Sequence, residues 1–62
     1  MKPGDLVEVV CNGADRGKIG IIVGFAPEHE RFHPWYRLWN VILSGGLRSI
    51  QGMNLVVISE TG

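Results

Sequence analysis

Glycine spacing constrains this chain more than any other feature of its sequence. Nine glycines among 62 residues divide the chain into short runs, and no segment keeps a helical period over ten residues. Between the glycine-rich turns, the runs are rich in branched apolar residues with a period of two, which is typical of β-strands. The pattern predicts five strands, at 5–11, 18–25, 35–43, 47–51 and 55–59. A single 3₁₀ turn is expected at 52–54, and the predicted fold class is all-β.

A chain of 62 residues is long enough for one domain, which we place at 1–62. Such a chain buries a small core, and a partly open five-stranded barrel best limits its exposed strand edges. In the third strand we expect Trp39, Val41 and Leu43 to point inward and Asn40 outward, with Phe25 behind Trp39.

The second predicted strand is apolar on both faces, and the alternation does not decide which face is inward. Its glycines at alternate positions predict a bend or the close approach of another backbone. Ile19, Ile21, Val23 and Phe25 share one face, and Lys18, Gly20, Ile22 and Gly24 share the other.

The charge balance argues against nucleic acid as the first choice of partner. Six basic and six acidic side chains cancel, whereas nucleic-acid binders usually carry a basic excess that neutralises phosphates. The single cysteine, Cys11, has no second cysteine for an internal disulfide. We see no apolar targeting segment and no run long enough to cross a membrane. We therefore expect a protein made in a reducing cytoplasm, without a membrane partner.

One stretch, EHERFHPW at 28–35, matches the H-E-x-x-H pattern of zinc proteases through His29 and His33. That chemistry requires both histidines on one helical face, a third protein ligand and an open position for water. Here Pro34 disfavours an α-helical conformation at His33, and the chain has no third histidine. We predict no catalytic residue, no metal site and no cofactor, so the protein is not expected to be an enzyme. A zinc hydrolase stays as the third alternative, and adventitious metal binding by the two histidines stays open.

Aromatic residues gather at the end of this stretch and directly after it. Four of the five, Phe32, Trp35, Tyr36 and Trp39, fall within eight positions, and a small barrel cannot bury them all. Exposed Trp and Tyr contribute strongly to protein interfaces and also stack on single-stranded bases. The alternative is that all four serve core or local packing. The predicted partner-binding residues are Arg31, Phe32, Trp35, Tyr36 and Arg37.

The N-terminal third, GDLVEVVCNGADRGKIGIIV at 4–23, resembles the KOW motif. The resemblance rests on Gly-Asp, alternating valines, a glycine-containing turn with a basic residue, and a later glycine followed by a branched residue. The turn after Val9 is about one residue longer than in the motif. KOW domains are SH3-like barrels, so the resemblance implies that fold and a loop that contacts RNA or protein. The implied contact residues are Gly13, Asp15, Arg16, Gly17 and Lys18; the alternative is an ordinary turn with solvated charges.

The rest of the chain, YRLWNVILSGGLRSIQGMNLVVIS at 36–59, resembles small SH3-like barrel proteins of tailed phages, including cyanophages. This resemblance implies a non-enzymatic structural protein that docks on a larger assembly, as capsid decoration, cement, or a neck or tail accessory. It would be virion-associated if phage-encoded. Its partner would be a viral structural protein or further copies of itself, contacted through the aromatic region and by β-augmentation at an exposed strand edge. The alternative is a KOW-like module that binds RNA or the ribosome.

Overall fold

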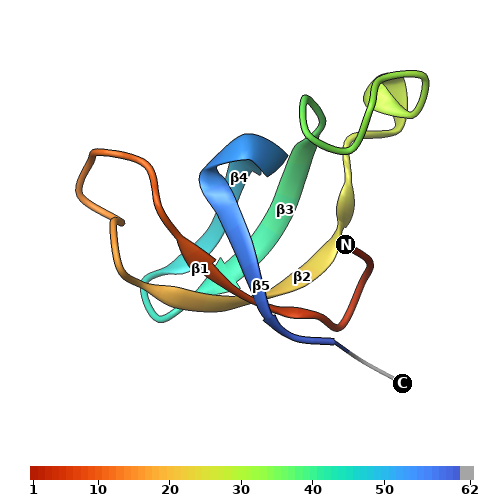
Figure 1. Cartoon of the computed structure of the whole chain (residues 1–62). Coiled ribbons are helices and arrows are strands. Elements are labelled where there is room, and N and C mark those ends of the chain that lie inside the picture. The colour runs from red at the N-terminus through yellow and green to blue at the C-terminus, as the bar shows by residue number, and fades with distance from the viewer. Residues whose placement is uncertain (61–62) are drawn as a thin grey trace.

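The fold is a single antiparallel sheet that curls around one core. The computed structural model describes residues 1–60 (Figure 1). The strands follow one another in the sheet in the order β4-β3-β2-β1-β5. The predicted fold class is confirmed: the protein is all-β, with five antiparallel strands in one barrel-like sheet and a short 3₁₀ turn before the last strand. The elements are β1 (Leu6–Val9), β2 (Ile19–Phe25), the 3₁₀ turn η1 (Pro27–His29), β3 (Leu38–Leu43), β4 (Gly46–Gln51), the 3₁₀ turn η2 (Gly52–Asn54) and β5 (Leu55–Ser59).

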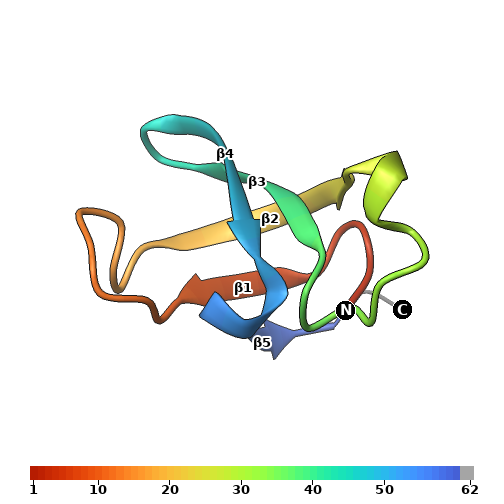
Figure 2. The same cartoon turned by 90° about the horizontal axis from the view of Figure 1, so that it is seen from above.

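Strand β2 is the strand that joins the two halves of the sheet. Its start pairs with β1, where Val7 lies opposite Gly20, and its end pairs with β3, where Phe25 lies opposite Trp39. A Cβ atom at Gly20 would lie 2.6 Å from the Ile42 carbonyl oxygen, so only glycine allows β3 to approach this closely. The close approach predicted from the glycines is thus confirmed at this position. It lets the sheet bend, and in Figure 2 β4 runs at a steep angle to β1 and β2.

The core consists of seven apolar side chains that are at most 5% exposed. Trp39 is the largest, and its indole meets the ring of Phe25 edge-on at 5.2 Å between centroids. The inward positions predicted for β3 and the packing of Phe25 behind Trp39 are therefore confirmed. The core residues are Val7, Val9, Ile22, Trp39, Val41, Leu43 and Leu55.

A bulge near the end of β2 changes which side of the sheet its side chains face. Ile22 is buried, whereas Ile19, Ile21 and Val23 are about half exposed. The register of β2 against β3 shifts between Ile22 and Gly24, and this shift brings Phe25 onto the core side opposite Trp39. Strict alternation would have left Phe25 on the same face as Ile21.

The predicted start of the third strand at residue 35 is wrong, because β3 begins at Leu38. Residues 35–37 instead belong to the preceding loop, where the Tyr36 N–H donates to the His33 carbonyl and the Trp35 carbonyl accepts from the Met53 N–H. These bonds to the loop and to η2 replace ladder bonds to a neighbouring strand. The other strands agree with the predictions to within two residues, and η2 and β5 have the predicted bounds.

The turn signal at Asn12 and Gly13 leads to a wide loop rather than a tight hairpin. Strand β1 ends at Val9, β2 begins at Ile19, and the positive φ of +84° falls at Gly17. Cys11 is half-buried in this loop and packs against the core as a free thiol. Within residues 1–60 there is no helix long and apolar enough to cross a membrane.

Candidate protein-binding surface

The β2–β3 connection, residues 26–37, is a compact loop at one end of the barrel (Figures 1 and 2), and we call it the aromatic loop. It opens with η1, where Pro27 takes the first helical position and thereby fixes φ without losing a needed N–H. Three successive backbone bonds, to the carbonyls of Ala26, Pro27 and His29, then turn the chain back on itself. The loop therefore has internal order of its own.

Arg37 closes the aromatic loop from inside. Its Nε donates to the Phe32 carbonyl and its Nη2 donates to the Glu30 carbonyl, both at 2.7 Å. Its guanidinium also lies 4.5 Å from the centroid of the Phe25 ring. A planar group with donors on two sides suits this position, because one side chain holds two carbonyls and an aromatic face together. The structure thus places Arg37 under the loop, whereas the other predicted partner-binding residues are exposed.

The turn η2 clamps the end of the aromatic loop. The Gly52 N–H donates to the Arg37 carbonyl at 2.9 Å, and the Met53 N–H donates to the Trp35 carbonyl at 2.8 Å. The buried indole of Trp39 donates to the Pro34 carbonyl at 2.9 Å. A Cβ atom at Gly52 would collide with that same carbonyl, so the absence of a side chain lets the loop lie against η2.

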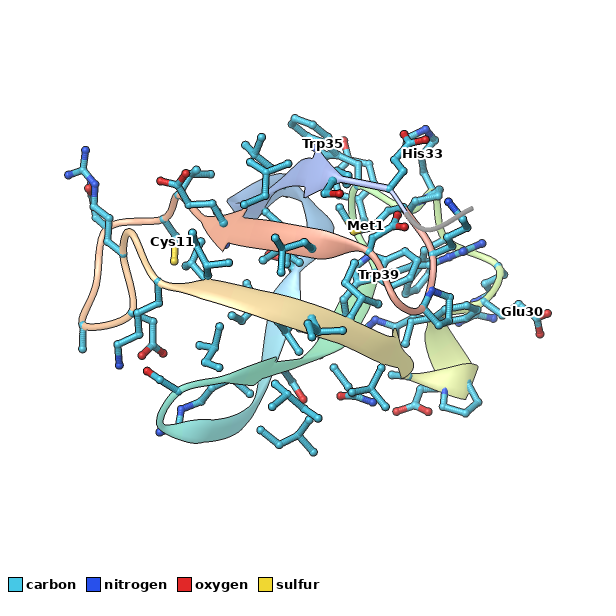
Figure 3. All side chains as sticks on the ribbon, turned by 90° about the horizontal axis from the view of Figure 1, so that it is seen from below. Met1, Cys11, Glu30, His33, Trp35 and Trp39 are labelled. Atoms are coloured by element: carbon cyan, nitrogen blue, oxygen red, sulfur yellow. The ribbon has the colours of Figure 1, made fainter. Side chains whose placement is uncertain are left out.

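On this clamped backbone, the side chains of Trp35 and Tyr36 are 53% and 56% exposed. Trp35 and His33 lie at the outer edge of the molecule, with His33 nearer the loop end (Figure 3). Phe32 is 38% exposed, with the Arg31 guanidinium 5.3 Å from its ring centroid and the His29 ring edge-on at 5.1 Å. The structure therefore gathers Arg31, Phe32, Trp35 and Tyr36 into one loop with a fixed backbone. A partner that covers these side chains does not have to order the chain that carries them.

The two histidines of the H-E-x-x-H pattern both serve the loop backbone. His29 Nδ1 accepts the Leu38 N–H at 3.2 Å, and His33 Nδ1 accepts the Trp35 N–H at 3.1 Å. An accepting Nδ1 places the proton of a neutral ring on Nε2, which leaves no free lone pair on either nitrogen. The segment is a 3₁₀ turn, not an α-helix, and no three metal-ligating side chains gather anywhere in residues 1–60.

The residues of the KOW-like loop lie together at the opposite end of the barrel (Figure 1). Asp15 holds two cations, with Oδ1 at 3.0 Å from Lys18 Nζ and Oδ2 at 3.8 Å from Arg48 Nε. Arg16 donates to the Asn12 side chain at 3.1 Å, while Gly13 has open space around it. Sequence reasoning missed Arg48, which reaches this end because Leu43 and Gly46 close a two-residue hairpin beside the loop. That hairpin was itself predictable from the Ser-Gly-Gly turn.

Comparison with known proteins found no relative of this chain. No protein-family model matches the chain, and no curated protein or solved structure is similar enough to count as a match.

Proposed function

We propose that this protein is a non-enzymatic binding module that docks on a larger protein assembly through the aromatic loop. The observation that carries the proposal is the contrast between side chains and backbone at Trp35 and Tyr36. Their side chains are more than half exposed, while the surrounding carbonyls of Pro34, Trp35 and Arg37 are each held by a hydrogen bond from the barrel.

Exposed aromatics on an ordered backbone suit protein recognition. Trp, Tyr and Arg are enriched among the few interface residues whose truncation costs about 2 kcal/mol or more of binding. The cost of ordering the loop has already been met during folding, so more of the contact energy remains for binding. The neutral net charge is consistent with a protein partner.

The resemblance of residues 36–59 to small tailed-phage proteins supports a virion as the assembly. In that setting the chain would be a capsid decoration or cement protein, or a neck or tail accessory. Its partner would be a viral structural protein much larger than itself.

The test is the content of purified virions produced with wild-type chain or with Trp35→Ala/Tyr36→Ala, measured by quantitative mass spectrometry. The double variant is expected to be depleted at least about tenfold, the change that follows from a loss of about 1.4 kcal/mol. Ile58→Ala on β5 is the matched control, because Ile58 is also an exposed apolar residue, 46% accessible, outside the loop. Equal occupancy of all three chains, or the absence of wild-type chain from particles, would contradict the proposal.

A KOW-like nucleic-acid module is the second candidate, and the gathering of Arg16, Lys18 and Arg48 at one end of the barrel favours it. Asp15 opposes it, because its carboxylate already neutralises part of that positive charge. Titration with single-stranded RNA at several salt concentrations separates the candidates. Tight binding whose salt slope falls on Arg16→Ala would favour the nucleic-acid function over protein docking.

A further inference from the structure

The outward face of β2, β3 and β4 carries a cluster of exposed apolar side chains that sequence patterning did not assign to any role. These residues are 49% to 58% exposed, although they lie in regular strands next to the core. We call this cluster the outer face. It consists of Ile19, Ile21, Val23, Ile42 and Leu47.

The register makes the outer face continuous. Ile21 lies directly opposite Ile42, and Ile42 lies directly opposite Leu47, so one apolar row crosses three strands. Side chains that are directly opposite in an antiparallel pair have Cβ atoms about 5 Å apart and touch one another. Ile19 and Val23 extend this row along β2. A contiguous exposed patch of this kind marks an interaction site, unlike apolar residues that are scattered singly.

The outer face carries no charge. No outward position of the described strands β2, β3 and β4 holds an acidic or basic side chain, although six acidic and six basic residues are present in the chain. A polar pair borders the outer face on the same side of the sheet, and its members bond to each other, with the Ser49 hydroxyl 3.0 Å from Asn40 Oδ1. Arg48 lies opposite the buried Val41 and so belongs to the other side of the sheet.

We propose that the outer face is an interface between two copies of this chain. A neutral apolar surface gains nothing from a charged partner, but it packs against its own copy without like-charge repulsion, and the zero net charge removes long-range repulsion as well. A two-fold arrangement uses the same patch on both subunits, so each of these apolar residues is buried in both copies.

The size of the outer face sets the expected strength of the dimer. Three neighbouring strands of six or seven residues span roughly 14 Å by 22 Å. An interface of that extent belongs to the small class, below about 1,200 Å² in total, which is typical of transient contacts. The dimer is therefore expected to be weak and concentration-dependent, with a dissociation constant of roughly 10 μM to 1 mM.

The exposed apolar residues of β5 do not extend this interface. Val56 and Ile58 lie on β5, and β1 separates that strand from β2. The charged Glu8 of β1 lies between Val56 and Ile19 in the same cross-strand row. Charge at this border is typical of the rim of an interface, and it leaves Val56 as a matched control position.

The interface and the aromatic loop share no residue, so this inference does not depend on the proposed function. If both hold, the dimer presents two aromatic loops at once. Two linked contacts bind a repetitive assembly more tightly than either alone, because the second contact forms at a high effective concentration.

Sedimentation equilibrium of the tag-free chain tests the proposal directly. The mean mass is expected to rise with concentration from 6.8 kDa towards twice that value. A mean mass that stays at the monomer value up to about 1 mM, the concentration at which even weak specific contacts form, overturns the proposal.

Two lysine variants then locate the interface. Ile42→Lys is expected to raise the dissociation constant at least tenfold, because the charge falls in the centre of the outer face. Val56→Lys, with similar exposure of 48%, is expected to leave it unchanged. Circular dichroism confirms that each variant is folded, and Ile42→Thr, which keeps the branched side chain, replaces Ile42→Lys if that variant unfolds. Dimerisation that survives at position 42, or that is lost equally in both variants, overturns the assignment.

Discussion

At the scale of single residues, Asp5 is the one fully buried carboxylate among the described residues. Its Oδ2 accepts the backbone N–H of Lys2 at 2.9 Å, and its Oδ1 lies 3.3 Å from Lys2 Nζ. Its carbonyl accepts the Ile22 N–H at 3.0 Å, which ties the N-terminal turn to β2. A buried charge with such bonds is strongly destabilising to remove, because the donors that it served lose their partner.

We therefore expect Asp5→Ala to lower the free energy of unfolding by roughly 1–3 kcal/mol. Urea denaturation followed by circular dichroism measures the change. The control is Lys2→Ala, because the Lys2 side chain is 49% exposed and its ion pair is worth at most about 1 kcal/mol, while its backbone N–H remains. Equal effects of the two substitutions would show that Asp5 stabilises the fold through its ion pair with the Lys2 ammonium group and not through its bond to the Lys2 backbone N–H.

At the scale of elements, η2 and the aromatic loop behave as one unit because Gly52 lets them touch. A methyl group at Gly52 would meet the Pro34 carbonyl and lie 3.0 Å from Trp39 Nε1. Gly52→Ala is therefore expected to push the loop away and to break the indole hydrogen bond. The indole N–H resonance of Trp39 and the exchange rates of the loop amides, both measured by nuclear magnetic resonance, report this displacement.

Gly24→Ala is the matched control for that experiment. A Cβ atom at Gly24 has no atom within 4 Å, and its φ is outside the left-handed region. We expect its stability to change by less than about 0.5 kcal/mol, as for most substitutions away from close contacts. A Trp39 resonance that stays in place in Gly52→Ala would mean that the clamp does not depend on the missing side chain.

How far the sequence predicts these elements depends on how local their causes are. The alternation in 39–43 correctly assigned the inward side chains of β3, and the turn at 52–54 followed from its own residues. The start of β3 did not, because residues 35–37 bond to η2, which lies fifteen to eighteen positions further along the chain. The inward face of β2 was also undetermined, since it depends on how closely β3 approaches Gly20.

The same distinction holds for the candidate site. The spacing of aromatic residues along the sequence singled out the aromatic cluster and the two arginines beside it. It did not distinguish Arg31, which is exposed, from Arg37, whose guanidinium stacks on Phe25 and holds two loop carbonyls. That difference arises from a contact between residues twelve positions apart, which no pattern within the loop encodes.

At the scale of the whole molecule, a core of seven side chains leaves little reserve of stability. A chain of 62 residues is expected to have a free energy of unfolding of roughly 3–9 kcal/mol. Truncating one buried leucine typically costs about 2–5 kcal/mol. Leu55→Ala is therefore expected to bring the molecule close to unfolding at room temperature, because Leu55 is 5% exposed and lies opposite the buried Val9.

Val56→Ala, one position further along β5, isolates the effect of burial from that of strand propensity. Val56 points outward, opposite Glu8, and is 48% exposed, so we expect its truncation to cost less than about 1 kcal/mol. Urea midpoints for both variants should be compared at a concentration well below that of dimer formation, because self-association adds its own stability. Similar midpoints for the two variants would mean that β5 contributes mainly through its backbone pairing with β1, and that the closure of the barrel does not depend on the seven-residue core.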